Sequence, residues 1–167
     1  VIFRIVRPMS AAGNVIGPEA IEAWAQANFP DTLWLDSWGE RAAFYNPGRR
    51  YPRGAYFLTL KQKDGEHDRA SRLDRQGIYR LNFSLQPARY EALFGRRPAR
   101  PAKGGVVAGD WDFTASDVLM PHPVYAWMGW VCILNPDQAR LSMLEELVGQ
   151  SYQRARKTLA RREKAKA

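Results

Sequence analysis

The chain is poor in the residues that build disulfides and metal sites, with one cysteine and two histidines among its 167 residues. A single cysteine excludes an intramolecular disulfide and a metal cage made of cysteines. Cys132 lies in an apolar run, so we expect a small buried side chain whose thiol is a poor nucleophile. The two histidines are far apart in the sequence and do not form a metal site without further ligands. We therefore expect neither a metal ion nor a cofactor.

The chain also lacks long apolar segments and the common catalytic motifs. No apolar run approaches the roughly 20 residues that span a bilayer, and the start lacks the apolar core of a secretory signal. A lone free cysteine suits a reducing compartment, so we expect a cytoplasmic protein without a membrane segment. The G-x-S-x-G elbow, the phosphate-binding loop, H-E-x-x-H and G-x-G-x-x-G are all missing, which argues against the enzymes that use them.

Positive charge is in excess, with a formal net charge of +8 and a pI near 9.9. This excess of positive charge is compatible with nucleic acid, acidic peptides and anionic small molecules as partners. The remaining composition, 46% hydrophobic and 25% charged residues, is typical of a globular protein. The length suits a single domain with one sizeable core.

The pattern of apolar residues predicts a helix followed by a run of strands. Gly17-Pro18 opens the helix and Pro30-Asp31 ends it. Three β-type runs follow, Thr32 to Trp38, Arg41 to Tyr45 and Ala55 to Leu60. Because the links between them are too short for parallel crossovers, we expect an antiparallel meander.

The second half of the chain predicts two more helices and two more strands. Lys61 to Gln76 is polar and is expected to be an exposed loop, as is the Pro- and Gly-rich segment Arg96 to Gly109. The final helix is expected to begin at a capping box formed by Ser142 and Glu145. The remaining elements are strands at Ile78 to Phe83 and Val131 to Leu134 and a helix at Pro87 to Phe94.

These elements predict an α+β fold of two layers, in which an antiparallel meander packs against helices. We expect one domain over residues 18–160. Residues 1–17 are expected to be an N-terminal extension that is flexible or not native, with a short strand at Val1 to Val6 as the alternative. Residues 161–167 are expected to form a basic C-terminal tail, whose cations complement a helix C-terminus.

Three motifs carry a family resemblance. They are RLDRQGIYRLN from Arg72 to Asn82, MPHPVY from Met120 to Tyr125 and WVCILNP from Trp130 to Pro136. In this order they resemble an uncharacterised bacterial family of unknown function, DUF6194, over nearly the whole domain. That family has no established activity, so the resemblance implies no catalytic or binding residues.

A more distant similarity is to the MmcQ/YjbR-like proteins, through the last strand and the helix that holds Leu147, Tyr152 and Leu159. That group resembles type III secretion chaperones, which implies a strand meander with helices on one side of the sheet. Some of its members have been proposed to bind DNA, which implies nucleic acid only by analogy. The loop Arg96 to Gly109 and the N-terminal extension depart from the smaller members of that group.

The first group of candidate site residues surrounds the fourth strand. Arginine offers forked donors to a carboxylate or a phosphate, and a nearby aspartate can orient it. The alternative is that the aspartate only fixes the loop through an arginine or a turn amide. The candidates are Arg72, Asp74, Arg75, Arg80 and Asn82.

The second group lies in the segment from Val118 to Pro136, around which we expect the chain to be organised. Pro121 and Pro123 restrain the backbone on both sides of His122, which suits a ligand contact or acid–base chemistry. It equally suits a histidine that only hydrogen-bonds a neighbouring strand. Aromatic residues that combine apolar area with a polar handle follow and are expected to line a groove: Tyr125, Trp127 and Trp130, with Trp34 or Trp38 from the meander.

Three functions follow from these candidates. The first is a non-catalytic binding module with a small basic, aromatic-lined pocket for an anionic small molecule or an acidic peptide. The second is nucleic-acid binding through the Arg49 to Arg53 loop, the Arg96 to Lys103 loop and the basic end of the last helix. The third is a small enzyme in which His122 is the acid or base and Asp74 or Asp112 assists.

Overall fold

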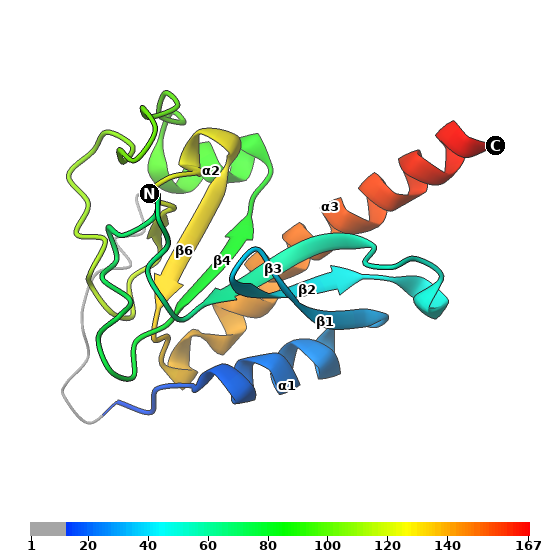
Figure 1. Ribbon diagram of the computed structural model, residues 1–167, viewed down its shortest axis with the longest axis horizontal. Coiled ribbons are helices and arrows are strands. Elements are labelled where there is room, and N and C mark those ends of the chain that lie inside the picture. The colour runs from blue at the N-terminus through cyan, green and yellow to red at the C-terminus, as the bar shows by residue number, and fades with distance from the viewer. Residues whose placement is uncertain (1–12) are drawn as a thin grey trace.

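The computed structural model describes residues 13–167 (Figure 1). The strand or extension expected at residues 1–6 lies outside this part of the chain. The helices are α1 (Pro18–Asn28), α2 (Pro87–Phe94) and α3 (Leu141–Lys166). The strands are β1 (Thr32–Ser37), β2 (Glu40–Tyr45), β3 (Ala55–Lys61), β4 (Arg80–Ser84), β5 (Met120–Pro121) and β6 (Trp130–Leu134), with short 3-10 turns at Pro47–Arg49, Ala126–Met128 and Gln138–Arg140.

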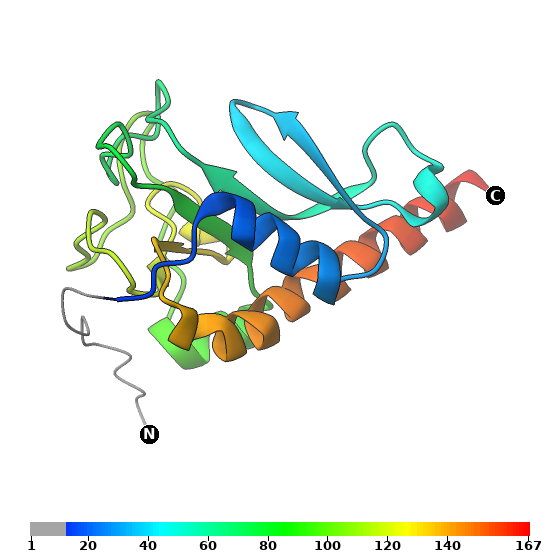
Figure 2. The same ribbon diagram turned by 90° about the horizontal axis from the view of Figure 1, so that it is seen from below.

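The six strands form one antiparallel sheet in the order β1-β2-β3-β4-β6-β5. The first four strands are neighbours both in sequence and in space, as expected when the connections are short. Helices α1 and α3 lie across one face of this sheet (Figure 2). Helix α2 is tied to α3 by an ion pair of 2.7 Å between Arg89 and Glu146. The predicted α+β class is therefore confirmed.

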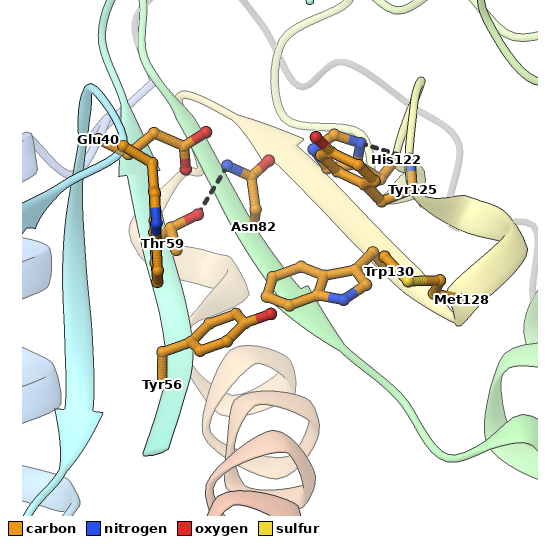
Figure 3. A pocket seen from close by; sticks show the side chains of 9 residues that line it. Glu40, Tyr56, Thr59, Asn82, His122, Tyr125, Met128 and Trp130 are labelled. Atoms are coloured by element: carbon orange, nitrogen blue, oxygen red, sulfur yellow. Dashed lines mark hydrogen bonds between the residues drawn. The ribbon is translucent and has the colours of Figure 1, made fainter. Parts of the chain in front are cut away.

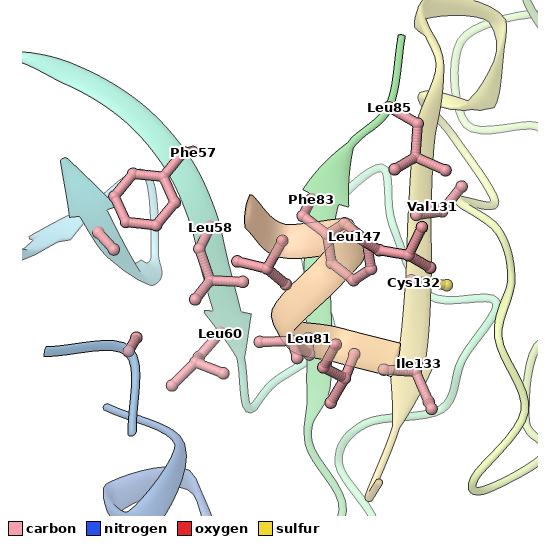
Figure 4. Close-up of a cluster of buried hydrophobic side chains, with 14 of the residues drawn as sticks. Phe57, Leu58, Leu60, Leu81, Phe83, Leu85, Val131, Cys132, Ile133 and Leu147 are labelled. Atoms are coloured by element: carbon pink, nitrogen blue, oxygen red, sulfur yellow. The ribbon is translucent and has the colours of Figure 1, made fainter. Parts of the chain in front are cut away.

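The core lies between the central strands and α3 (Figure 4). Alternate residues of a strand point to the same face, so β3, β4 and β6 turn their apolar residues toward the helix. Each such side chain contributes about 1.5–3 kcal/mol when fully buried. The strand residues involved are Leu58, Leu60, Leu81, Phe83, Val131 and Ile133, and Leu144, Leu147 and Val148 of α3 meet them. The intervening polar residues point to the other face, where the candidate site lies.

The packed part of the chain begins before α1. Ile16 is 5% exposed and belongs to the core, and its amide donates to the Pro136 carbonyl at 2.9 Å. The Tyr79 hydroxyl donates to the Ile16 carbonyl at 2.5 Å. Residues 14–17, expected to belong to a flexible extension, are thus held by the segment that connects β6 to α3.

The start of α3 differs from the prediction, and the capping box is wrong. The helix begins at Leu141, so Ser142 already lies inside it and caps nothing. A 3-10 turn precedes the helix, and there the Asp137 carboxylate accepts from the Ala139 amide at 2.8 Å. Asp137 is an Asx-type cap one turn earlier than the S-x-x-E pattern indicated.

Helix α3 continues to Lys166, so the basic residues 161–166 form its last turns. Beyond Leu159 the helix buries none of its side chains, and this end projects past the edge of the sheet (Figure 2). Among the helices of residues 13–167, none combines the length and apolar character that crossing a membrane requires.

Candidate functional site

A pocket of about 290 Å³ lies on the sheet face opposite α1 and α3 (Figure 3). Its floor comes from β2, β3 and β4, and its walls come from the β1–β2 turn, β3, β6 and the segment before β6. The floor is polar and the walls are aromatic, so the two parts offer different contacts to a ligand. The lining residues are Trp38, Glu40, Tyr56, Thr59, Asn82, His122, Tyr125, Met128 and Trp130.

The floor is set by strand register. Thr59 of β3 is paired with Asn82 of β4, and both point away from the core because their neighbours Leu58 and Leu81 point into it. The Asn82 amide nitrogen donates to the Thr59 hydroxyl at 3.0 Å. One amide hydrogen of Asn82 and the hydroxyl hydrogen of Thr59 therefore remain for a ligand.

Arg80 lies beneath the floor and is 0% exposed. Its Nε donates to the Asn82 carbonyl oxygen at 2.7 Å, and its Nη1 donates to the Ser71 hydroxyl at 2.9 Å. Both ends of the guanidinium also contact the Asp68 carboxylate. Burial acts to lower the pKa of Arg80, but the hydrogen bond and the charge of Asp68 raise it above its ordinary value. This buried pair fixes the orientation of Asn82.

Charges around the floor cancel in pairs. Lys61 lies beside Arg80 in the sheet and is 3.4 Å from the Glu40 carboxylate. Arg80 is balanced in the same way by Asp68. The predicted basic pocket is therefore close to neutral, with two cations and two carboxylates around it.

His122 is 2% exposed and closes one side of the floor. Its Nδ1 accepts from the amides of Val124 at 3.0 Å and Tyr125 at 3.1 Å. In the neutral ring the proton consequently belongs on Nε2, which lies 3.2 Å from Nη2 of Arg80. Burial, and after it the charges of Arg80 and Lys61, lower the pKa of His122 well below its ordinary value. The imidazole is thus a neutral donor at the pocket.

The walls are aromatic side chains in mutual contact. Tyr56 stacks on Trp130 with ring centroids 5.6 Å apart and an interplanar angle of 20°. Trp38 meets Tyr56 edge to face at 5.3 Å, and Tyr125 covers His122 at 5.0 Å. Trp38 does not end β1 as expected but lies in the β1–β2 turn with φ 56°. This turn resembles type I′, which requires positive φ at two central positions.

Four of the eight predicted site residues meet here. Arg80, Asn82, His122 and Tyr125 form one cluster, although some forty positions separate the first from the last. The two segments are brought together because β4 pairs with β6 and β6 pairs with β5, which ends one residue before His122.

The other four predicted residues lie elsewhere. The Asp74 carboxylate accepts from the Asp64 amide at 3.0 Å, and Arg75 donates to the Ser71 and Thr114 carbonyls. These contacts fix the loop between β3 and β4, which is the structural alternative stated for that aspartate. Arg72 is an exposed residue of this loop. Trp127 does not line the pocket and lies beneath the guanidinium of Arg100 at 4.9 Å.

Sequence reasoning missed Glu40, Thr59, Lys61 and Asp68. The first three had a signal, because polar residues alternate with leucines along β3 and Glu40 begins the neighbouring strand. Asp68 had none, because it belongs to a polar loop that was expected to be exposed throughout. That loop instead folds over the sheet and buries Ser71 and Leu73.

Cys132 is sealed beneath the same face. It is 0% exposed, and burial raises the pKa of its thiol to about 12. Across residues 13–167, no group of three or more His, Cys, Asp or Glu side chains is placed to hold a metal ion.

The matched family spans this whole arrangement. A model of a family of unknown function, DUF6194, matches residues 16–164. The chain belongs to this family. The DUF6194 match includes all six strands, α1, α2, all but the last two residues of α3 and every residue that lines the pocket. No curated protein and no solved structure matches the chain.

Proposed function

We propose that this DUF6194 protein is a non-catalytic binding module whose pocket takes a small ligand with a flat apolar part and a polar edge. One observation carries the proposal. The described residues expose six large hydrophobic side chains, and four of them, Trp38, Tyr56, Tyr125 and Met128, line this one pocket. Aromatic side chains gathered around a concave polar floor favour ligand binding.

The floor determines which polar edge the ligand needs. Nε2–H of His122 is a donor at the pocket and attracts an acceptor oxygen, whereas Arg80 is fully buried beneath the floor and does not line the pocket. Asn82 offers a further donor to the pocket. The Glu40 carboxylate across the floor accepts from an N–H group. A ligand that carries a carbonyl or carboxylate oxygen and a neighbouring N–H group satisfies both sides.

The charge balance decides between ligand classes. Arg80 and Lys61 are each neutralised by a carboxylate, so the pocket does not select an anion by net charge. An anionic small molecule or an acidic peptide contacts the floor through one acceptor oxygen only. A planar heterocycle makes the same contact and also stacks on the aromatic walls. We therefore favour the planar ligand.

Binding is favoured over catalysis by the state of His122. A general base needs a free nitrogen lone pair, and here Nδ1 already accepts from two amides. The carboxylates considered as its helpers are engaged elsewhere, Asp74 with the Asp64 amide and Asp112 with Thr114. The imidazole therefore acts as a positioned hydrogen-bond donor.

Saturation-transfer NMR with a set of planar heterocycles that carry adjacent carbonyl and N–H groups tests the proposal. We expect hits that Tyr125→Ala weakens by about 10-fold, because loss of one stacking face costs about 1–3 kcal/mol. Val106→Ala is the matched control, since Val106 is similarly exposed but does not line the pocket. Hits that bind the wild type and Tyr125→Ala equally would reject the proposal.

A further inference from the structure

The net positive charge of the chain is concentrated at one end of the molecule. Residues 49–53 and 154–166 hold ten of the 25 Lys and Arg residues and one of the 17 Asp and Glu residues. The rest of the chain carries 15 cations and 16 acids and is therefore close to neutral. The two segments are neighbours, because Arg50 and Tyr51 both contact Glu163 of α3 and Arg162 donates to the Gly54 carbonyl.

Part of this charge faces a second hollow, which we name the basic groove. Arg154, Thr158 and Arg162 line it from α3. They are spaced at i, i+4 and i+8, so they lie on one side of the helix over about 12 Å. The groove offers two guanidinium groups with a hydroxyl between them, which are donors suited to phosphate oxygens.

The basic groove is continuous with the aromatic pocket. Both hollows are lined by Tyr56, Met128 and Trp130, so the stacked pair of Tyr56 and Trp130 forms the ridge between them. A ring on the pocket side of this ridge and a phosphate on the helix side can belong to one ligand.

We infer that the pocket binds a nucleotide unit, with its base in the aromatic pocket and its phosphate on the basic groove. This inference rests on the proposed function and names its ligand class. A nucleobase has a flat face for Tyr56 and Trp130 and carries carbonyl and N–H groups for His122, Asn82 and Glu40. Arg154 and Arg162 are two turns apart along α3 and can each contact a phosphate. A single strand supplies a second phosphate next to the first, so we assign the nucleotide unit to a single strand. Aromatic platforms beside basic grooves bind single strands in this way.

A duplex and an anionic membrane fit this surface less well. Bases in a duplex are stacked on their neighbours and cannot enter the pocket unless they are flipped out. A membrane-binding helix needs large apolar residues opposite its cations, whereas beyond Leu159 the apolar residues of α3 are alanines. Arg97, which follows α2, lies close enough to Arg154 for its charge to contribute, after burial and Arg161, to lowering the pKa of that groove residue.

Filter binding at low salt tests the inference with a labelled oligonucleotide of mixed sequence, prepared as a single strand and as a duplex. We expect the single strand to bind at least about 10-fold more tightly than the duplex. Tyr56→Ala should weaken the single strand by about 10-fold, since one stacked base is worth about 1–3 kcal/mol. Arg162→Glu should weaken it to a similar extent.

Arg156→Glu is the matched control for charge. It makes the same change in net charge on the same helix, but Arg156 faces Tyr45 and Tyr152 on the other side. Equal losses from Arg156→Glu and Arg162→Glu, or a duplex bound as tightly as the strand, would overturn the inference in favour of unspecific attraction. If a mononucleotide competes as well as the strand, the nucleotide site is supported and its ligand is a free nucleotide.

The outcomes separate this inference from the proposed function. If planar heterocycles bind in a Tyr125-dependent way but no nucleotide or strand does, the nucleotide is rejected and the binding module stands. If neither class of ligand binds, both are rejected.

Discussion

At the scale of single residues, Arg80 connects the stability of the fold to the shape of the site. It donates to Asn82 on the pocket side and pairs with Asp68 on the loop side. Burying a charge costs free energy unless it is hydrogen-bonded, and here all three guanidinium nitrogens donate to acceptors on Asn82, Ser71 and Asp68. The pocket floor is consequently as rigid as the ion pair beneath it.

Arg80→Met should lower the free energy of unfolding by about 3–5 kcal/mol, because it leaves the largely buried Asp68 carboxylate without its partner. Urea denaturation measures the loss. The double variant Arg80→Met/Asp68→Leu should recover part of it, since no buried charge then remains unpaired. Arg89→Met is the control and should cost less than about 1 kcal/mol, because its pair with Glu146 is exposed. A small cost for Arg80→Met would contradict the role assigned to this pair.

The depressed pKa of His122 makes stability depend on pH. The unfolded chain takes up a proton at this histidine near pH 6.5, whereas the folded protein does so only at much lower pH. Since the unfolded state binds more protons in that window, stability is complete above about pH 6.5 and falls by up to about 1.4 kcal/mol per pH unit below it.

Urea denaturation at pH 7.5 and pH 5.5 checks this dependence. His122→Gln removes the titrating group and should flatten the decline between these two values. His67→Gln is the control for a histidine substitution on the exposed surface. An equal decline in the wild type and in His122→Gln would show that other groups cause it.

At the scale of elements, the segment before α1 behaves as part of the fold. Ile16→Ala should destabilise the protein by about 2–4 kcal/mol, as expected for a buried aliphatic side chain. The neighbouring Val15 is 52% exposed, so Val15→Ala should change stability by less than about 0.5 kcal/mol. Thermal unfolding of the two variants compares the positions directly. An equal loss of stability in both would mean that this segment is a flexible extension, as its composition suggested.

The elements were predictable where the signal was local. The alternation of apolar residues located β1 to β4 and β6 to within one or two residues, and Pro18 and Pro87 marked the starts of α1 and α2. Contacts between distant segments carried no such signal. Asp68 reaches Arg80 only because its loop folds back over the sheet, and Asn14 to Ile16 looked flexible because their partners follow β6.

The candidate site was likewise predictable where the signal was local. Polar residues on an otherwise apolar strand pointed to Arg80 and Asn82, and the prolines around His122 pointed to a restrained turn. Asp74 and Arg75 had the same composition as a binding site, but their partners are backbone amides and carbonyls of their own surroundings. Composition does not distinguish a side chain that fixes a loop from one that meets a ligand.

At the scale of the whole molecule, charge and shape are divided between two ends. The cations gather where α3 projects past the sheet, and the long loops that follow β3 and α2 lie toward the other end (Figure 1). The aromatic pocket lies between them. For the single strand proposed above, this distribution of charge predicts that the strand leaves the pocket toward the cationic end.

The salt dependence of single-strand binding should reflect only the phosphates in the basic groove. Two contacted phosphates give a slope of about −1.4 in a plot of log K against log salt concentration. Arg162→Glu should make the slope shallower, and Arg156→Glu should leave it unchanged. A slope steeper than about −4 would mean that the whole cationic end binds the strand, against a defined groove.

The aromatic walls have one further consequence. Trp38 and Trp130 are two of the six tryptophans of the chain, and both line the pocket. A ring that stacks against an indole alters its emission, so a ligand that binds in this pocket should change the intrinsic tryptophan fluorescence of the protein. Fractions of a cell extract can therefore be added to the purified protein and tested for quenching of its tryptophan emission. This allows the natural ligand to be sought without a label and without assuming its chemistry.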